Sequence, residues 1–228
     1  MRRRGSSSAW TRPLQKKGAI ERLRTDPPAG SVIIDIDEMG PVAAKSYPGR
    51  QLACAWSQAQ DGGAQWRAKQ EADYGRRGKG YVFGAFIAAS GEAFTDCYDR
   101  RTTAHFVDFL VHVDAWLPAE REVVYAIMDN LSAHRSADAL LFSAHHPRWR
   151  FVFQPTYAPY LNLIEPWWKT LRSLALKGRR FERWEEVEQA IVAATRYWNA
   201  HRHPFVWGRR RRRQPQRRPG IAQVANVP

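Results

Sequence analysis

Three carboxylates of this chain stand at positions where a folded protein could bring them together. Asp37 and Asp129 each close a short apolar run, and Glu165 opens a stretch with helical periodicity. Thirty-five residues lie between Asp129 and Glu165. Carboxylate oxygens are the ligands that Mg²⁺ prefers, usually a few of them together with substrate phosphates. The residue types and positions therefore predict divalent-metal chemistry on a polymer that carries phosphate.

The positive charge of the chain is concentrated at its two ends. The net charge is +14, of which residues 1–30 carry +6 and residues 207–228 carry +7, leaving +1 for residues 31–206. A strongly basic chain indicates a polyanionic partner, in this case nucleic acid. Because the middle of the chain is nearly neutral, its contacts to such a partner must come from individual, locally placed residues.

Composition predicts one folded domain between two basic tails. The chain is 44% hydrophobic and 12% aromatic, as in globular proteins. We expect a basic arm or linker at 1–30 with a short helix around 15–23, a domain at 31–207, and a disordered Arg-rich tail at 208–228. The tail would add salt-dependent affinity for DNA without reading its sequence.

Two further observations concern location and cysteine chemistry. The sequence has no apolar run of 18 residues and no apolar stretch after its basic start, so we expect a cytoplasmic protein with no membrane partner. Cys54 and Cys97 lack the spacing of metal ligands, and we interpret them as small core residues.

Hydrophobic periodicity predicts a mixed sheet flanked by helices. Apolar runs bounded by turn residues predict strands, and apolar residues at helical spacing predict helices. The strands are expected at 31–37, 81–87, 93–98, 123–129 and 151–153, and the helices at 103–117, 137–145, 165–175 and 183–199. A hairpin followed by alternating helices and strands is typical of an α/β fold. If the strands that end at Asp37 and Asp129 are parallel neighbours, their carboxylates meet at one edge of the sheet.

The first of these carboxylates has a competitor on the same strand. In a strand of period two, Asp35 and Asp37 share one face, and Ile34 and Ile36 share the other. Two acids on one face of a buried strand are costly unless they are paired, bind metal or lie at the strand end. We favour Asp37 as the ligand and keep Asp35 as the alternative. Glu38 is interpreted as an exposed turn acid, with an auxiliary ligand as the alternative.

Several residues near Asp129 and Glu165 could contact nucleic acid. Glu165 lies in the first turn of its helix, where the helix dipole favours a carboxylate. Lys169 and Arg172 follow at i+4 and i+7 on the same face and could hold the DNA backbone. His134, five residues after Asp129, is predicted to lie near the DNA or to help orient the site, and a structural hydrogen-bonding role is the alternative.

Five blocks of sequence carry a family resemblance. In chain order they read DIDEMGPV…SYPGR (35–50), YGRRGKGYVFGAF (74–86), AIMDNLSAHRS (126–136), PTYAPYLNLIEPWW (155–168) and YWNAHRHPFVW (197–207). Together they resemble the DDE-type transposases of mariner-like bacterial insertion sequences, over about residues 31–207. The resemblance implies an RNase H-like fold with a mixed five-stranded sheet in the order 3-2-1-4-5.

The resemblance also implies the reaction, the cofactors and the partners. The catalytic and metal-binding triad would be Asp37, Asp129 and Glu165, holding two Mg²⁺ (or Mn²⁺) ions with Asp37 bridging them. The protein would cleave and join DNA strands at the ends of an insertion sequence. Its partners would be the terminal inverted repeats and target DNA, bound by a homodimer associated with the bacterial nucleoid.

One departure from the family pattern keeps alternative functions open. Members usually begin with helix-turn-helix segments, whereas only about 30 residues precede the first predicted catalytic strand here. We therefore expect either a fragment that holds the catalytic half or a DNA-binding half that is encoded elsewhere. The alternatives are a catalytically inactive DNA-binding remnant of a transposase, or another RNase H-like nuclease or integrase with the same triad.

Overall fold

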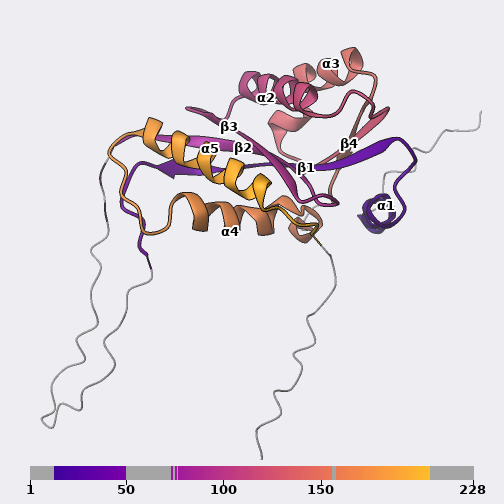
Figure 1. Ribbon diagram of the computed structural model, residues 1–228. Coiled ribbons are helices and arrows are strands. Elements are labelled where there is room, and N and C mark those ends of the chain that lie inside the picture. The colour runs from indigo at the N-terminus through magenta and orange to yellow at the C-terminus, as the bar shows by residue number, and fades with distance from the viewer. Residues whose placement is uncertain (1–12, 50–72, 74, 76, 156–157, 206–228) are drawn as a thin grey trace, which may run out of the picture.

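The fold is built on one five-stranded sheet, seen in the computed structural model of Figure 1. The structure describes residues 13–49, 73, 75, 77–155 and 158–205. Across the sheet the strands are β3 (Glu92–Tyr98), β2 (Lys79–Ile87), β1 (Ser31–Ala43), β4 (Val123–Met128) and β5 (Trp149–Phe153). β1 pairs antiparallel with β2 and parallel with β4, and β4 pairs parallel with β5. The predicted mixed sheet and its 3-2-1-4-5 order are confirmed.

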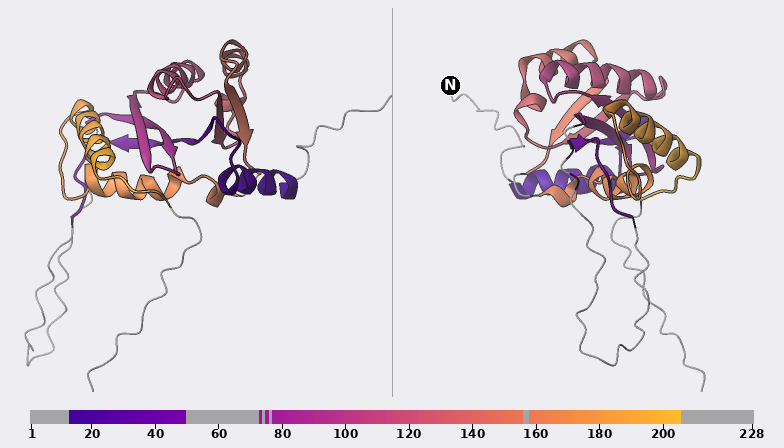
Figure 2. Two further views of the ribbon diagram at one scale, coloured as in Figure 1. Left: turned by 45° about the vertical axis from the view of Figure 1, so that its right-hand side comes forward. Right: turned by 90° about the vertical axis from the view of Figure 1, so that its left-hand side faces the viewer.

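Helices cover both faces of this sheet (Figures 1 and 2). One face carries α2 (Thr103–Trp116) and α3 (Ala137–His145). The other carries α4 (Ile164–Ala175) and α5 (Trp184–Ala200), with α1 (Pro13–Thr25) on the same side. There are also two short 3₁₀ turns. The first, η1 (Ser132–Arg135), follows β4, and the second, η2 (Pro159–Leu161), precedes α4. No helix in the described ranges is long and apolar enough to cross a membrane.

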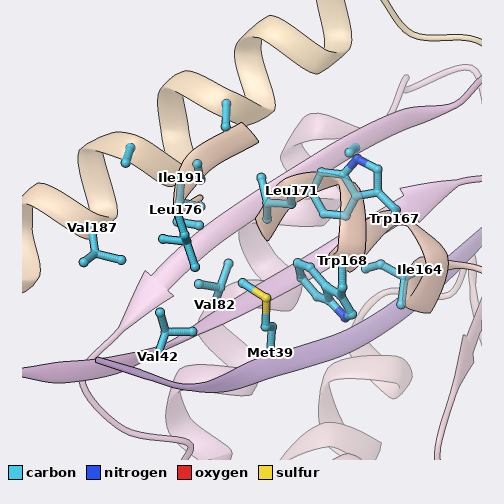
Figure 3. Packing of buried hydrophobic residues seen from close by; sticks show 14 of the residues in the cluster. Met39, Val42, Val82, Ile164, Trp167, Trp168, Leu171, Leu176, Val187 and Ile191 are labelled. Carbon is cyan, nitrogen blue, oxygen red and sulfur yellow. The ribbon is translucent and has the colours of Figure 1, made fainter. Parts of the chain in front are cut away.

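The central strand alternates between two cores, as its sequence predicts. Ile34 and Ile36 are fully buried against the side of the sheet that α2 covers. On the opposite side, Met39 packs with residues of α4 and α5 in a separate cluster (Figure 3). Trp167 and Trp168 belong to that cluster and are buried. The period-two pattern thus places Asp35 and Asp37 on the α4 side.

β1 is longer than its apolar run indicates. Gly40 and Pro41 predict a turn, but the strand continues through them to Ala43 and stays paired with β2. The register shifts between Met39 and Val42, so the irregular pair forms a bulge within the strand. A bulge accommodates Pro41, which has no N–H to donate to a regular ladder. Asp37 and Glu38 consequently lie in the middle of a strand and not at its end.

The N-terminal segment contributes to the folded body. The predicted short helix is present as α1, and its Ile20 is fully buried against Ile127 and Val152 of the sheet. The sequence places residues 1–30 outside the domain, whereas residues 17–25 pack on it. Residues 1–12 and the Arg-rich tail from 206 lie outside the described residues, as does Cys54. Cys97 is partly buried beside the core, as expected.

Candidate active site

The parallel register of β1 and β4 brings Asp37 and Asp129 to the same position along the two strands. Their parallel ladder pairs Asp35 with Ile127 as its last described pair. Asp37 and Asp129 each follow two residues later, on neighbouring strands that run in the same direction. The prediction that the two strands are parallel neighbours is therefore confirmed, and both carboxylates lie at one edge of the β1–β4 pair.

The start of α4 is fastened to β1, which places Glu165 at the same edge. The side-chain amide of Asn162 donates to the carbonyl of Ile36 at 3.1 Å, and the N–H of Leu163 donates to Asp35 at 3.2 Å. Both bonds are buried and lie within three residues of Glu165. The Glu165 side chain itself is exposed in the first turn of α4.

A glycine on β2 allows this close approach. Gly84 pairs with Asp37 across the β1–β2 ladder. A Cβ atom at Gly84 would come within 3.0 Å of the side chains of Trp168 and Ile164, closer than real Cβ atoms pack. Only a residue without a side chain therefore lets the first turns of α4 rest on the sheet beside Asp37.

The electrostatics of Asp37 show that several carboxylates meet here. Burial, followed by the negative charges of Glu165, Glu38 and Asp129, raises the pKa of Asp37 to about 7 against the opposing effect of one backbone hydrogen bond. Among the described residues Asp37 forms no ion pair. Uncompensated negative charge of this kind favours either a proton or a bound cation. The structure thus brings the three predicted carboxylates into one electrostatic neighbourhood.

The competing aspartate, Asp35, is already paired. Its side chain is fully buried, and Arg24 of α1 donates to both of its oxygens, one at 3.0 Å. One oxygen also accepts the N–H of Leu163. Burial raises the pKa of Asp35 despite the guanidinium beside it. With both oxygens in use and no exposure, Asp35 is suited to a structural role, which favours Asp37 as the ligand.

The donor set fits hard cations bound by few protein ligands. In the described part of the chain, no three His, Cys, Asp or Glu side chains lie close enough to hold one ion together. A two-ion arrangement does not require such a cluster, because Mg²⁺ is commonly held by one or two carboxylates with waters and substrate phosphates. The oxygen-only set of Asp37, Asp129 and Glu165 suits Mg²⁺ or Mn²⁺ better than zinc.

His134 lies inside the protein and not on a DNA-facing surface. Its side chain is 0% exposed, with Nε2 2.7 Å from Glu38 Oε1 and Nδ1 2.9 Å from Asp129 Oδ1. Burial alone would lower its pKa, but the two carboxylates raise the pKa of His134 to about 9. The same contact holds the pKa of Asp129 low. A buried imidazole cannot touch DNA, so the predicted DNA contact of His134 is corrected to a contact within the site.

Glu38 is the residue of this neighbourhood that the sequence interpretation missed. It was expected at an exposed turn, but its side chain is only 2% exposed. Its partner His134 lies 96 residues away in the chain. The one available signal was the direct adjacency of Glu38 to Asp37, which does not identify a partner.

The two predicted backbone-contacting cations lie on the exposed side of α4. Lys169 and Arg172 are both exposed. The Nε of Arg172 donates to Met39 Sδ at 3.0 Å, which places the guanidinium beside β1. Both residues therefore remain available to a ligand near Glu165, and their DNA contact stays a prediction.

Comparison with known proteins places this geometry in context. A family model described as DDE superfamily endonuclease matches residues 57–188, a range that includes Asp129 and Glu165 and begins after Asp37. The uncharacterised 39 kDa protein of insertion element IS630 from Shigella sonnei is 26% identical over 122 residues. That match covers 52% of this chain and 35% of the relative, so the chain spans about a third of the curated relative's length.

Solved structures show the same fold at low sequence identity. The Mos1 mariner paired-end complex with Mn has a TM-score of 0.60 and 13% identity, covering 90% of this chain and 58% of that one. The Mos1 transposase catalytic domain with Raltegravir and Mn has a TM-score of 0.55 and 12% identity, covering 90% and 88%. These likenesses confirm the predicted RNase H-like class of the sheet and its flanking helices.

Proposed function

The chain belongs to the DDE superfamily endonucleases, and from this premise we propose that it cleaves and joins DNA strands at the ends of an insertion sequence. One observation carries the proposal: Asp37, with its raised pKa, lies among the negative charges of Asp129 and Glu165, just beyond the end of the β1–β4 ladder. Such a concentration of carboxylates lowers stability unless a cation neutralises it, so it indicates a functional site.

Asp37, Asp129 and Glu165 are the residues that would hold the metal ions. When bound, two Mg²⁺ or Mn²⁺ ions would activate the attacking oxygen and neutralise charge on the leaving oxygen. β1 holds Asp37 within the sheet, β4 ends directly before Asp129, and the bonds before α4 hold Glu165 in its first turn. Rigid placement lets the ligands keep their geometry while a phosphate group moves between oxygens.

DNA is the proposed partner, with the element's terminal inverted repeats and the target as its two kinds of site. Lys169 and Arg172 would hold the backbone beside the scissile phosphate, contacts that position the strand without reading its sequence. Pairing of two element ends requires two active sites, so we propose a homodimer on DNA. The chromosome of the host would then be the place of action, which makes the protein nucleoid-associated.

The proposal is tested by metal-dependent nicking of a duplex that carries the element's ends. We expect Mg²⁺ or Mn²⁺ to support nicking and Asp129→Asn to abolish it, because an amide cannot replace an ionised metal ligand. Glu122→Gln is the matched control, since Glu122 precedes the first residue of β4 just as Asp129 follows the last. It should keep the activity of the unaltered protein. Nicking by the Asn variant at the normal rate would refute the assigned triad.

The same assay separates the two alternative functions. A DNA-binding remnant would bind the duplex but not nick it with either metal. Another nuclease or integrase of this fold would nick a duplex with scrambled ends as fast as one with the correct ends. The reaction proposed here requires both the metal and the correct ends.

A further inference from the structure

We propose that Glu38 and His134 act as a positioning pair that fixes Asp129 relative to Asp37 for metal binding. This inference rests on the proposed function, because it concerns the same carboxylates. Neither Glu38 nor His134 would touch the metal or the DNA. Their role would be to fix the position of the Asp129 carboxylate through a contact on the buried side of it.

The first observation is a buried bridge between two strands. The His134 ring lies between Glu38 of β1, whose Oε1 is hydrogen-bonded to Nε2 at 2.7 Å, and Asp129 after β4, whose Oδ1 lies 2.9 Å from Nδ1 at ion-pair distance without hydrogen-bond geometry. The His134 and Glu38 side chains are 0% and 2% exposed, whereas that of Asp129 is 52% exposed. The bridge therefore has a buried end on β1 and an open end at the proposed ligand. Phe106 packs against the ring with the centroids 4.4 Å apart, which fixes the ring position.

The second observation explains why a bridge is needed at this point. The β1–β4 ladder ends with the pair Asp35 and Ile127, so no described ladder pair joins the two strands at the level of Asp37 and Asp129. Beyond that level β1 stays paired with β2 alone. The Glu38–His134–Asp129 contacts thus replace the missing ladder where the separation of the two ligands matters.

The third observation concerns which oxygen of Asp129 is left for a metal. Oδ1 accepts the N–H of Leu131 at 2.9 Å and also faces His134 Nδ1. Within the described residues, no contact occupies Oδ2. With one oxygen held and the carboxylate half exposed, Asp129 is arranged to offer a single oxygen to an ion. Outer partners that orient a ligand in this way typically change metal affinity by 10–100-fold.

Burial also argues against Glu38 as a direct ligand. At 2% exposure its carboxylate is closed to solvent, and its Oε1 is occupied by His134. A direct ligand should instead be reachable by ions from solution, as Asp129 and Glu165 are. The geometry consequently separates the acid that would bind the ion from the acid that would orient its ligand.

The test measures Mn²⁺ affinity by electron paramagnetic resonance on the full chain without DNA. We expect His134→Gln and Glu38→Gln each to weaken Mn²⁺ binding by about 10–100-fold. Affinity for DNA without metal should not change, because neither residue is at the surface. His112→Gln is the matched control, since His112 also contacts a carboxylate, Asp96 at 2.8 Å, on an exposed part of the fold. It should bind Mn²⁺ normally.

A double-variant cycle separates orientation from general structural support. If the pair acts through Asp129, then Asp129→Asn combined with Glu38→Gln should bind Mn²⁺ no more weakly than Asp129→Asn alone. Additive losses would overturn the inference. His134→Gln replaces a buried ring and could unfold the chain. If circular dichroism shows that the His134→Gln protein is unfolded, the double-variant cycle with Glu38→Gln tests the inference by itself.

Two other results have distinct meanings. Normal Mn²⁺ affinity in both single variants would overturn the positioning role. A loss of Mn²⁺ affinity in Glu38→Gln, with normal affinity in a folded His134→Gln, would make Glu38 a direct ligand and would also overturn that role. Normal Mn²⁺ affinity in Asp129→Asn would instead refute the proposed metal site itself. The failure of the inference and that of the proposed function can therefore be told apart.

Discussion

At the scale of single residues, two aspartates on one strand face have different environments. Asp35 is neutralised by Arg24, whereas Asp37 lies among other carboxylates without an ion pair in the described residues. A raised pKa in an acid means that ionisation at neutral pH lowers stability. Asp37 would therefore impose a cost on the metal-free protein, as functional sites often do.

This cost can be measured through Asp37→Asn. The pKa of Asp37 is raised from 3.8 to about 7 in the folded protein, so stability falls as the pH rises from about 4 to 7 and stays low above it. The neutral amide removes this loss. At pH 8 with a chelator, we expect Asp37→Asn to raise the free energy of unfolding, measured with urea, by roughly 1–3 kcal/mol. The variant should also be inactive. The gain should shrink as the pH falls towards 4. An equal gain at all pH values would contradict the assignment.

The three proposed ligands stand out in the sequence because each lies at a visible boundary. Asp37 and Asp129 follow apolar runs, and Glu165 precedes an apolar helical stripe. The partnership of Glu38 with His134 had no such signal, because it joins two strands through a contact that depends on how they pack. Local patterns predict where a residue lies along its own element, but not what it meets across 96 residues.

At the scale of elements, α1 ties the N-terminal segment to the site. Arg24 spans the gap between α1 and β1, where it pairs with Asp35, and it also donates to the carbonyl of Leu161 at 2.6 Å. Leu161 ends η2, directly before the segment that leads into α4. One guanidinium thus joins three elements within a few residues of Asp37 and Glu165.

The importance of this joint can be tested by removing one partner at a time. Arg24→Met leaves the fully buried Asp35 without its cation, which typically costs about 3–5 kcal/mol of unfolding free energy. Adding Asp35→Asn should recover a large part of that loss, because the double variant has no unpaired buried charge. Urea unfolding at pH 7 measures both. If the double variant were as unstable as Arg24→Met, burial of charge would not be the cause.

The element boundaries show where sequence reasoning reached its limit. Strand β1 was predicted to end at Asp37 because Gly40 and Pro41 usually mark a turn, yet pairing with β2 carries it to Ala43 as a bulge. Residues 1–30 have too little apolar periodicity to predict an independent domain, so the sequence places α1 in an arm or linker. Its tertiary contacts depend on only a few side chains, notably Ile20 and Arg24.

At the scale of the whole molecule, the positive charge and the candidate site are separated along the chain. Residues 31–206 carry a net charge of only +1, while the two ends carry most of the positive charge. Within the folded part, Lys169 and Arg172 are the cations nearest in sequence to Glu165. The strength of DNA binding should therefore depend mainly on the ends, and the placement of the scissile phosphate on the folded part.

Deletion of residues 209–228 tests this separation. The segment contains seven arginines and no acid, so its removal should flatten the dependence of DNA affinity on salt. Each phosphate contact contributes about 0.9 to the slope of log affinity against log salt concentration, and we expect a reduction of roughly 3–6. Deleting 219–228, which holds no charged residue, is the control. Equal slopes for both deletions would mean that the arginines do not contact DNA.

The topology was predictable only in part from periodicity. The strands and helices followed from apolar patterns and turn residues, but the strand order 3-2-1-4-5 came from the family resemblance. Hydrophobic patterns show that a face is buried and not which helix covers it. The two cores on opposite faces of β1, one with α2 and one with α4 and α5, emerge only in three dimensions.

The fit of α4 against the sheet at Gly84 has a consequence for how this chain tolerates sequence change. Any side chain at that position meets Trp168 and Ile164 before it reaches free space, and the displacement would be passed to Glu165 in the same helix. In a screen that scores loss of activity, position 84 would be grouped with the carboxylates, although glycine offers no functional group to the reaction. Laboratory evolution of this site must accordingly keep glycine at position 84, because the packing of α4 requires that no side chain is present there.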